Sequence, residues 1–170
     1  MIICAGRSES FDFAHPIGVG LVESAMNLTK LLLQKKPDSL LFIGSAGSYG
    51  NYKIFDIVTA TEAVNIELGY LANKCYTPLD NANVPRETSI VMNSSNFITT
   101  DTLSAKRLLT QGVELENMEF FSLVKVAKEF GTPIKGVFVV TNYCDANAHD
   151  DFKKNHKKAK QLLTELYEKA

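Results

Sequence analysis

Four polar segments of this sequence carry the groups that could do chemistry: Arg7–Glu9, Gly44–Gly50, Glu116–Glu119 and Cys144–Asp151. In the segment Glu116-Asn117-Met118-Glu119, acidic residues stand just before an apolar helical pattern. A carboxylate there would be partly desolvated, and such a group either hydrogen-bonds firmly or shifts its pKa. The alternative is that these residues only favour a first helical turn, where the helix dipole attracts negative charge.

The glycine-rich segment Gly44-Ser45-Ala46-Gly47 offers a backbone that a ligand can approach closely. Its amide groups could face an anion or a sugar hydroxyl. It lacks the GxGxxG and GxxxxGK[ST] spacings, so the sequence supports neither a dinucleotide fingerprint nor a phosphate-binding P-loop. The alternative is a glycine-rich turn between a strand and a helix, without a ligand.

Acidic and histidine residues gather after the last apolar run: Asp145, His149, Asp150, Asp151 and His156. They invite a metal-site hypothesis, but the sequence has no HExxH motif and no clustered Cys/His spacing. The alternative is that the histidines are exposed on the final helix and that Asp150 or Asp151 caps it. We therefore expect no metal and no cofactor.

The segments that must position these groups alternate between strand and helix patterns. Apolar or β-branched runs predict strands at Met1–Ala5, Ser39–Ile43, Ile57–Ile66, Ser89–Met92 and Lys135–Tyr143. Helical spacing of apolar residues predicts helices over residues 20–34, 102–109 and 120–130, and a last helix that contains Ala159–Leu166. Residues 72–88, rich in Pro, Asn and Asp, predict a loop. This alternation is typical of an α/β sheet with helices packed on it.

Three of the polar segments follow predicted strands, namely Arg7–Glu9, Gly44–Gly50 and Cys144–Asp151. In α/β folds, ligands bind beyond the carboxyl ends of the strands, where the loops emerge. One pocket could therefore collect all three segments.

Length and charge exclude several classes of protein. The chain has 170 residues, which predicts a single domain over residues 1–170. It carries 18 Lys and Arg against 19 Asp and Glu, a net charge of −1, so it has no electrostatic footprint for nucleic acid or an anionic membrane. Only Lys153–Lys160 is locally basic, and we interpret it as the solvated face of a helix. We expect neither a nucleic-acid nor a membrane partner.

Location is also suggested by the sequence. Its apolar runs are far shorter than the roughly 18 residues that span a bilayer, and its first residues do not resemble a secretory signal. The three cysteines are far apart and have no CxxC spacing, which suits reduced thiols. We expect a cytoplasmic protein.

Taken together, several segments resemble the nucleoside phosphorylase/nucleosidase superfamily, most of all its methylthioadenosine/S-adenosylhomocysteine nucleosidases. Their shared order along nearly the whole chain carries the resemblance. The segments are Gly18-Val19-Gly20, Lys36-Pro37-Asp38, Gly44-Ser45-Ala46-Gly47, Phe55-Asp56-Ile57-Val58, Asn96-Phe97-Ile98, Glu116-Asn117-Met118-Glu119 and Cys144-Asp145. The resemblance implies a three-layer α/β sandwich with a central mixed sheet, and cleavage of a ribosidic C–N bond through an oxocarbenium-like state.

The resemblance also implies a role for individual residues. Asp145 matches the acid that protonates purine N7, Glu119 with the backbone of Met118 matches the grip on the sugar hydroxyls, and Glu9 matches the glutamate that activates water. The remaining expected substrate contacts lie in the glycine-rich segment and in the walls that enclose the base: Ser45, Gly47, Phe97, Ile98 and Phe152.

Water and phosphate are the two candidate nucleophiles. Phosphorylases of this superfamily hold phosphate with arginines, which offer a permanently charged, bidentate fork. Phe42 stands where hexameric phosphorylases have arginine, and Glu9 would repel an incoming dianion, so the sequence favours water. Arg7 keeps a purine nucleoside phosphorylase as the alternative.

The chain departs from the family pattern at several positions of the motifs, and its region before Gly18 is much shorter than is typical, as if a hairpin had been deleted. Asn117, Phe120 and Ala148 replace residues that are usual in the motifs, and Phe120 could narrow the sugar pocket. A non-catalytic nucleoside-binding module of the same fold is therefore a further alternative. The resemblance also implies a homo-oligomer, a dimer or hexamer. The Tyr- and Asn-rich residues 69–84 are a candidate contact edge, and the alternative is an exposed mobile loop.

Overall fold

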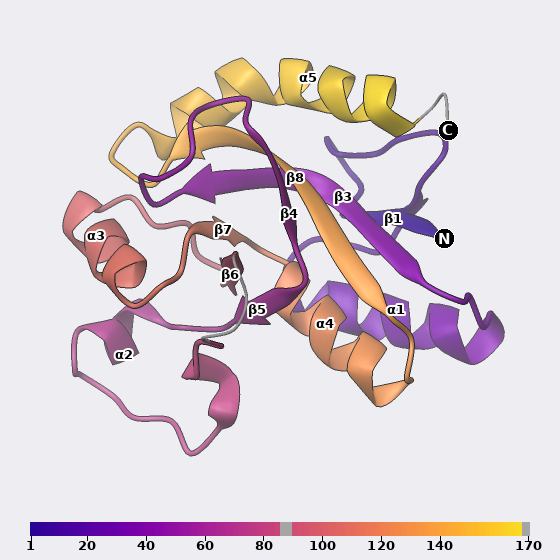
Figure 1. Ribbon diagram of the computed structural model, residues 1–170, viewed down its shortest axis with the longest axis horizontal. Helices are drawn as coiled ribbons and strands as arrows, with labels where there is room; N and C mark the ends of the chain where they lie inside the picture. Colours follow the sequence, from indigo (N-terminus) through magenta and orange to yellow (C-terminus); the bar gives the residue numbers. More distant parts are fainter. Residues whose placement is uncertain (86–89, 168–170) are drawn as a thin grey trace.

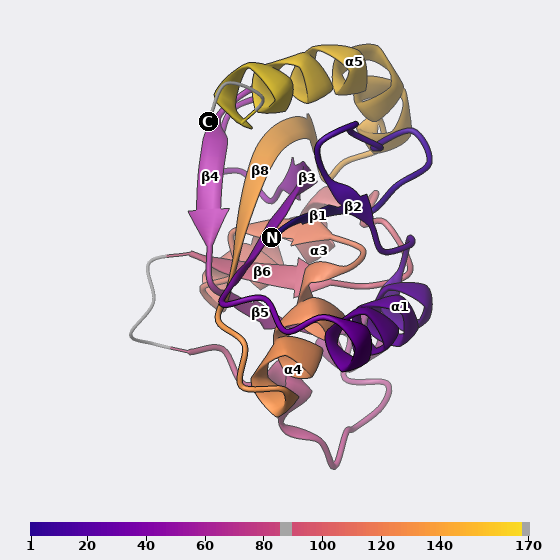
Figure 2. The same ribbon diagram turned by 90° about the vertical axis from the view of Figure 1, so that its right-hand side faces the viewer.

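The computed structural model describes residues 1–85 and 90–167. A mixed eight-stranded sheet forms the middle layer, and helices cover both of its faces (Figure 1). Helix α5 (Ala148–Tyr167) packs on one face, whereas α1 (Leu21–Gln34) and α4 (Phe120–Glu129) lie side by side on the other (Figures 1 and 2). The three-layer α/β sandwich expected from the resemblance is confirmed.

Strand β3 (Leu40–Ser48) is the centre of the sheet. It runs parallel to β1 (Ile2–Cys4) and β8 (Ile134–Tyr143), and its last two residues pair antiparallel with β7 (Leu115–Asn117). The remaining strands extend the sheet outward: β2 (His15–Pro16) beside β1, β4 (Ile57–Ala60) beside β8, β6 (Val91–Ser94) beside β7 and β5 (Glu62–Val64) beside β6. One strand thus joins the two halves of the sheet.

Apolar burial explains why the central elements form. Leu28, Leu31 and Leu32 of α1 are buried against the sheet, as their helical spacing predicts. The rings of Phe42, Phe120 and Phe138 join β3, α4 and β8, with centroids 5.2 to 6.1 Å apart. Aromatic pairs at this spacing contribute about 0.5–1.5 kcal/mol beyond the area they bury. This cluster fixes α4, and therefore the residues just before it, against the central strands.

The end of the sheet near β5 and β6 has its own small core. The helices α2 (Leu68–Leu71) and α3 (Thr102–Thr110) pack together there, and α3 begins at Asp101, whose side chain accepts a hydrogen bond from Ser104 N. Such N-caps typically contribute about 1 kcal/mol. The segment between α2 and β6 holds a short 3-10 helix, Asp80–Ala82.

The structure corrects some of the predicted elements. Strand β3 does not end at Ile43: it continues through the glycine-rich segment to Ser48, because β8 and β7 supply pairing partners there. The single strand predicted over Ile57–Ile66 is divided at Thr61 into β4 and β5, which pair with different neighbours. The predicted loop over 72–88 is described only to residue 85, and Ser89 of the predicted strand Ser89–Met92 also lies outside the described residues.

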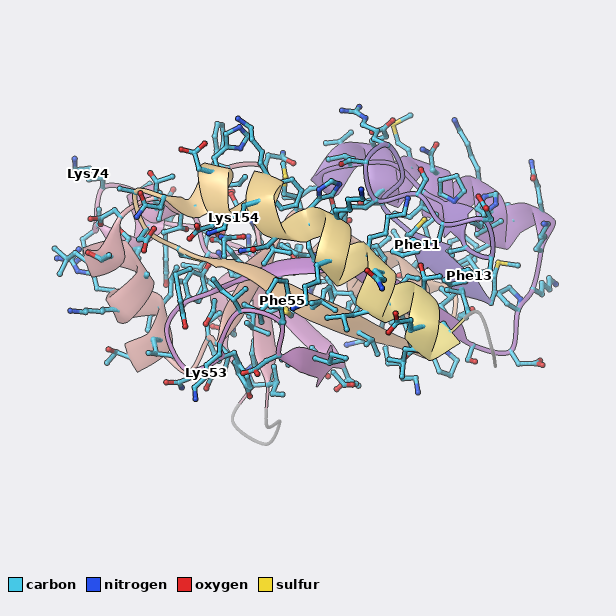
Figure 3. The ribbon with its side chains drawn as sticks, turned by 90° about the horizontal axis from the view of Figure 1, so that it is seen from above. Phe11, Phe13, Lys53, Phe55, Lys74 and Lys154 are labelled. Atoms are coloured by element: carbon cyan, nitrogen blue, oxygen red, sulfur yellow. The ribbon has the colours of Figure 1, made fainter. Side chains whose placement is uncertain are left out.

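Helix α5 has the solvated basic face expected from the sequence. Lys153, Lys154, Lys157 and Lys158 are exposed on it. Figure 3 shows Phe55 and Phe11 on opposite sides of α5. The amine of Lys158 lies 4.2 Å from the ring centroid of Phe55, and the amine of Lys160 lies 5.4 Å from the ring centroid of Phe11, so cation–π contacts hold both edges of the helix. No helix among residues 1–85 and 90–167 is both long and apolar enough to cross a membrane.

Candidate active site

A cavity of about 310 Å³ lies where the polar segments meet, after the end of β1 and along the carboxyl-terminal parts of β3 and β8. Each of the four polar segments contributes to its wall. The lining residues are Gly6, Arg7, Ser8, Glu9, Val19, Ser45, Ala46, Gly47, Phe97, Ile98, Glu116, Asn117, Met118, Glu119, Asn142, Ala148, His149 and Phe152. The topology therefore brings residues that are distant along the chain to one hollow.

Glu9 enters the cavity from a tight turn after β1. Its backbone N–H donates to Gly6 O at 3.0 Å, and Gly6 has a φ of 93°, which glycine adopts without a steric penalty. The Glu9 carboxylate Oε1 accepts a hydrogen bond from Ser45 N at 2.9 Å, so β3 holds the side chain in place. Desolvation by burial raises the pKa of Glu9, and the hydrogen bonds from Ser45 oppose that rise.

Glu119 lies just before α4 and is only 5% exposed. Its Oε1 accepts a hydrogen bond from Gly20 N at 3.0 Å, which comes from the start of α1. Its Oε2 accepts hydrogen bonds from Met118 N and Asn117 Nδ2, both at 3.2 Å. The carboxylate is thus held by two backbone donors and one amide, at the point where the chain leaves β7 for α4.

Burial raises the pKa of Glu119 to about 7, and the negative charge of Glu9 adds to that rise. Hydrogen bonds from Gly20 and Met118 act in the opposite direction. Two carboxyl groups that share a cavity disfavour each other's ionisation, so one of them holds a proton more readily than a solvated glutamate does. This end of the cavity can therefore accept or release a proton near neutral pH.

Apolar side chains form another part of the wall. Phe97 and Ile98 line the cavity from the loop after β6, and Phe152 lines it from the first turns of α5. Phe97 is 74% exposed, so its ring stands at the mouth of the cavity rather than in the core. A flat aromatic ligand would bury these side chains when it binds.

Most of the residues expected from the resemblance meet here. Besides Glu9 and Glu119, the cavity is lined by Ser45, Gly47, Phe97, Ile98, Met118 and Phe152, and by Arg7 of the alternative phosphate site. The Ser45 amide, however, already donates to Glu9. The glycine-rich backbone therefore holds Glu9 in place at this point, rather than facing a ligand through that amide.

Asp145 is not among the lining residues of the cavity. Its carboxylate Oδ1 accepts a hydrogen bond from Asn147 N at 2.8 Å, and its carbonyl accepts one from Ala148 N at 3.0 Å. Asp145 thus stabilises the turn that begins α5, while Asp150 and Asp151 lie inside the first turn of the helix instead of capping it. Ala148, one turn further on, does line the cavity, so Asp145 lies close to the wall with its side chain engaged elsewhere.

Two aromatic residues singled out from the sequence lie in the core. Phe120 is fully buried and packs edge-on against Phe138, and it does not line the cavity, so it cannot narrow the sugar pocket directly. Phe42 is 1% exposed and likewise does not line the cavity. Both side chains point into the aromatic cluster because the alternation of β3 and the first turn of α4 direct them there.

Glu116 is a lining residue that the sequence indicated only as part of a segment. It lies on β7, opposite Gly47 of β3, and is 6% exposed. Its Oε2 accepts a hydrogen bond from the Tyr49 hydroxyl at 2.8 Å, and its Oε1 accepts one from Thr99 N at 2.9 Å. The three-residue strand β7 has no readable periodicity, so only its acidic residues marked it.

The described residues hold no group of three or more His, Cys, Asp or Glu side chains arranged to bind a metal ion. Cys4, Cys75 and Cys144 are free thiols.

Comparison with known proteins supports this fold. The family model of the phosphorylase superfamily matches residues 70–170. No curated protein matches the chain significantly.

Solved structures with the same fold are numerous. A mutant 5′-methylthioadenosine/S-adenosylhomocysteine nucleosidase of Helicobacter pylori, with 5′-methylthioadenosine in its active site, aligns over 99% of this chain and 97% of its own with a TM-score of 0.75 and 18% identity. A mutant futalosine hydrolase of the same organism aligns over 99% and 98% with a TM-score of 0.75 and 17% identity. The nucleosidase of Colwellia psychrerythraea in complex with adenine aligns over 94% and 88% with a TM-score of 0.73 and 14% identity. The family match and the shared fold together show that the chain belongs to the phosphorylase superfamily.

Proposed function

We propose that the protein is an N-ribosyl hydrolase that cleaves the glycosidic bond of a purine nucleoside or thionucleoside, of the methylthioadenosine/S-adenosylhomocysteine type, to free base and pentose. One observation carries the proposal: the carboxyl groups of Glu9 and Glu119 share a cavity that is also lined by the apolar side chains of Phe97, Ile98 and Phe152. The acidic end suits a sugar and a nucleophile, and the apolar wall suits a flat base.

The chemistry of glycosidic cleavage gives each acidic residue a role. As the C–N bond breaks, its electron pair leaves with the base, and positive charge develops on the sugar. Glu119 accepts hydrogen bonds from the ribose hydroxyls, which strengthen as that charge develops. Glu9 orients a water molecule and takes its proton while the water oxygen bonds to the anomeric carbon.

The base must gain a proton as it leaves, and we assign this step to Asp145. In the structure its Oδ1 accepts a hydrogen bond from Asn147 N, so the side chain must turn from the start of α5 toward Ala148 and the cavity before it can donate. Catalytic hydrogen bonds are often formed only in the substrate complex. The proposal therefore includes a movement of this turn when substrate binds.

A phosphorylase is the second candidate, because Arg7 lies at the cavity mouth. Its side chain is 73% exposed, and its contact with Glu23 is long, at 3.4 Å, which leaves the guanidinium able to meet an anion. The carboxylate of Glu9 in the same cavity opposes a phosphate dianion, which is why we place water first.

A non-catalytic nucleoside-binding module is the third candidate. It is favoured by the engagement of Asp145 outside the cavity and by Asn117, which supplies an amide where the family motif has a carboxylate. Binding without turnover would be its signature, seen as thermal stabilisation by a nucleoside that is not consumed.

The deciding experiment measures base release. The protein is incubated with methylthioadenosine, S-adenosylhomocysteine, adenosine and inosine, each with and without phosphate, and free base and free or phosphorylated pentose are quantified. We expect base release that does not need phosphate. Release that strictly requires phosphate would assign the phosphorylase, and stabilisation without release would assign the binding module.

We also propose that the chain acts as one catalytic domain over residues 1–170 and as a cytoplasmic homo-oligomer, a dimer or hexamer. Phe97 and Ile98 line the cavity but are 74% and 47% exposed, which favours a partner copy that closes the mouth. Sedimentation equilibrium measures the number of copies, and a monomer with full activity would exclude this part of the proposal.

A further inference from the structure

Glu116 is a buried acidic side chain on the cavity wall that has no role in the proposed cleavage. It is 6% exposed, on β7, and it lines the cavity together with Gly47 and Asn142. A buried carboxylate costs free energy unless hydrogen bonds and charges compensate for the lost hydration. The groups around Glu116 therefore indicate which interaction its carboxylate can make with a ligand.

The groups that contact Glu116 within the protein are hydrogen-bond donors. The Tyr49 hydroxyl donates to Oε2 at 2.8 Å, and Thr99 N donates to Oε1 at 2.9 Å. The thiol of Cys144 also hydrogen-bonds to the carboxylate. Burial raises the pKa of Glu116, and these donors oppose that rise by stabilising the ionised form. An ionised carboxylate has about four acceptor sites, so three donors leave acceptor capacity on this cavity-lining side chain.

In the part of the chain that the structure describes, no salt bridge balances the charge of this carboxylate. Among residues 1–85 and 90–167, the two salt bridges are Arg7–Glu23 and Lys153–Asp150, and neither involves Glu116. A buried carboxylate without a cation gains most from further N–H or O–H donors. Glu116 lines the cavity, so a ligand bound there can supply them.

The orientation of the carboxylate is fixed by a chain of buried side chains. Asn93 Nδ2 lies 3.4 Å from the Tyr49 hydroxyl oxygen and donates to it, which directs the hydroxyl proton toward Glu116. Asn93 is itself anchored by Ile66, because its Oδ1 accepts from Ile66 N at 2.7 Å and its Nδ2 donates to Ile66 O at 3.1 Å. Such a chain positions Glu116 rather than leaving it free to turn away.

Glu116 belongs to the aromatic end of the cavity. Thr99, which holds its Oε1, directly follows Phe97 and Ile98 on the apolar wall. On its other side it faces Gly47, where an added Cβ would lie 3.2 Å from Glu116 Cγ, 3.0 Å from Asn142 Nδ2 and 2.9 Å from Cys144 Sγ. A flat base stacked on the apolar wall would thus present an edge to this carboxylate.

We propose that Glu116 determines which base is accepted, as the hydrogen-bond acceptor for an N–H group on the edge of the base, with Tyr49 and Asn93 as positioning residues. The substrate class is a nucleoside whose base carries an amino or ring N–H donor on that edge. This inference rests on the proposed nucleosidase function, which supplies the base in the cavity. A base without such a donor leaves the carboxylate unpaired in a desolvated site, and such sites discriminate strongly.

The test compares adenosine with purine riboside, which has the same ring but lacks the amino group. For each, kcat/KM is measured with the wild type, E116Q and E114Q. Glu114 is a matched control, because it lies two residues away and accepts a hydrogen bond from the exposed amide of Asn51 at 2.7 Å, without lining the cavity. We expect E116Q to lower the ratio of kcat/KM for adenosine to kcat/KM for purine riboside about 10-fold or more. E114Q should leave this ratio as in the wild type.

Y49F tests the positioning role. Removing the hydroxyl should lower the same ratio about 3- to 10-fold, mainly through KM, because the carboxylate keeps its charge but loses its orientation. A loss that is equal for both substrates would indicate a structural role for Tyr49 alone. Circular dichroism and the unfolding midpoint verify that each variant is folded.

Different failures have different signatures. If the wild type releases base but E116Q shows the wild-type ratio, the inference on Glu116 is overturned and the nucleosidase stands. If the wild type releases no base, calorimetry with adenine and purine replaces kinetics: a preference for adenine that E116Q abolishes supports the inference without the enzyme. No preference for adenine in that experiment overturns it.

Discussion

Glu119 and Glu116 lie three residues apart in the chain and on the wall of one cavity, yet they receive their hydrogen bonds from different sources. Glu119 is held by the backbone N–H groups of Gly20 and Met118 and by one amide. Glu116 is held by the Tyr49 hydroxyl, the Cys144 thiol and a single backbone N–H. One carboxylate is built into the fold, and the other is supported mainly by side chains.

The sugar end of the cavity, at Glu119, and the base end, at Glu116, differ in whether a substitution can remove their hydrogen-bond donors. Backbone donors at the start of α1 and before α4 cannot be removed by substitution without moving the helices. The Tyr49 hydroxyl and the Cys144 thiol can each be removed by one substitution that keeps the shape of the side chain. We infer that the sugar end carries the chemistry common to its substrates, whereas the base end can be retuned for a different base.

The largest expected effect is at the sugar end. E119Q should lower kcat/KM about 10²–10³-fold for every nucleoside that the wild type accepts, because the lost interaction strengthens with charge on the sugar. E129Q, at the exposed far end of α4, is the control and should behave as the wild type. A loss confined to one base would instead place Glu119 at the base end and break the comparison.

The free energy of unfolding should depend on pH, because the pKa of Glu119 is raised in the folded chain. Its pKa is about 7 in the folded chain, against an ordinary value of 4.5. The folded state therefore binds more protons than the unfolded state between these values, and the free energy of unfolding falls as pH rises from about 4.5 to 7 and levels off above. From the shift alone the loss is on the order of 3 kcal/mol.

E119Q isolates this contribution. Urea unfolding of both proteins from pH 5 to 8 gives the difference in free energy of unfolding at each pH. We expect this difference to change in favour of the variant as pH rises, because the variant has no proton to lose. Glu9 and Glu116 also have raised pKa values, so the wild type alone would not separate the three groups. A difference that stays constant with pH would contradict the raised pKa.

Long periodic elements could be predicted from the sequence, and short, partner-dependent ones could not. The apolar spacing of α1 and the continuous apolar run of β8 predicted both correctly, since local pattern alone determines them. The continuation of β3 through Gly44–Ser48 depends on pairing with β8 and β7, which are far away in the chain. Local sequence there favours a turn, and tertiary pairing overrides it.

The residues of the candidate active site likewise fall into those that the sequence predicted and those that it did not. The family resemblance located Glu9 and Glu119 because motif and strand ends coincide at both positions. It did not place the Asp145 side chain, since a residue at a helix start can either hydrogen-bond locally or face the cavity, and the local bond to Asn147 N is formed here. Glu116 was missed as a site residue because its partners Tyr49 and Asn93 lie 67 and 23 positions away in sequence, and only the sheet brings them together.

The substitution G47A, next to Glu116 on the cavity wall, should affect the choice of base more strongly than the cleavage itself. In G47A, the new Cβ lies 2.9 Å from Cys144 Sγ and 3.2 Å from Glu116 Cγ, so the wall must shift. Overpacking of this kind costs about 1–3 kcal/mol. We expect kcat/KM for adenosine to fall more than kcat/KM for purine riboside, so that the ratio of the two decreases.

G69A is the control for this experiment. Gly69 lies in α2, and among the described residues an added Cβ there would approach the thiol of the exposed Cys75, at 3.3 Å. Unfolding in urea gives the stability cost of both variants, and the kinetic ratio of the two substrates gives the effect on the base end. A G47A protein with the wild-type ratio would mean that the base does not reach this wall.

The smallest effect is expected from N117D, which restores a carboxylate at the position where the family motif has one. Asn117 Nδ2 donates to Glu119 Oε2 at 3.2 Å, while its Oδ1 accepts from Ser94 Oγ at 2.7 Å and from Phe120 N at 3.2 Å. Aspartate keeps the two accepted bonds but turns a negative oxygen toward Glu119. The pKa of the pair should rise above that of Glu119 alone, at a cost of about 1 kcal/mol at pH 8 that largely disappears at pH 6, where the pair holds a proton. Urea unfolding at both pH values measures this stability cost, and the double variant N117D/E119Q should remove its pH dependence by restoring an amide opposite the carboxylate.

In N117D the preference for adenosine over purine riboside should remain that of the wild type, because Tyr49 and Thr99 still hold Glu116. A change in that preference would show that the two ends of the cavity are coupled.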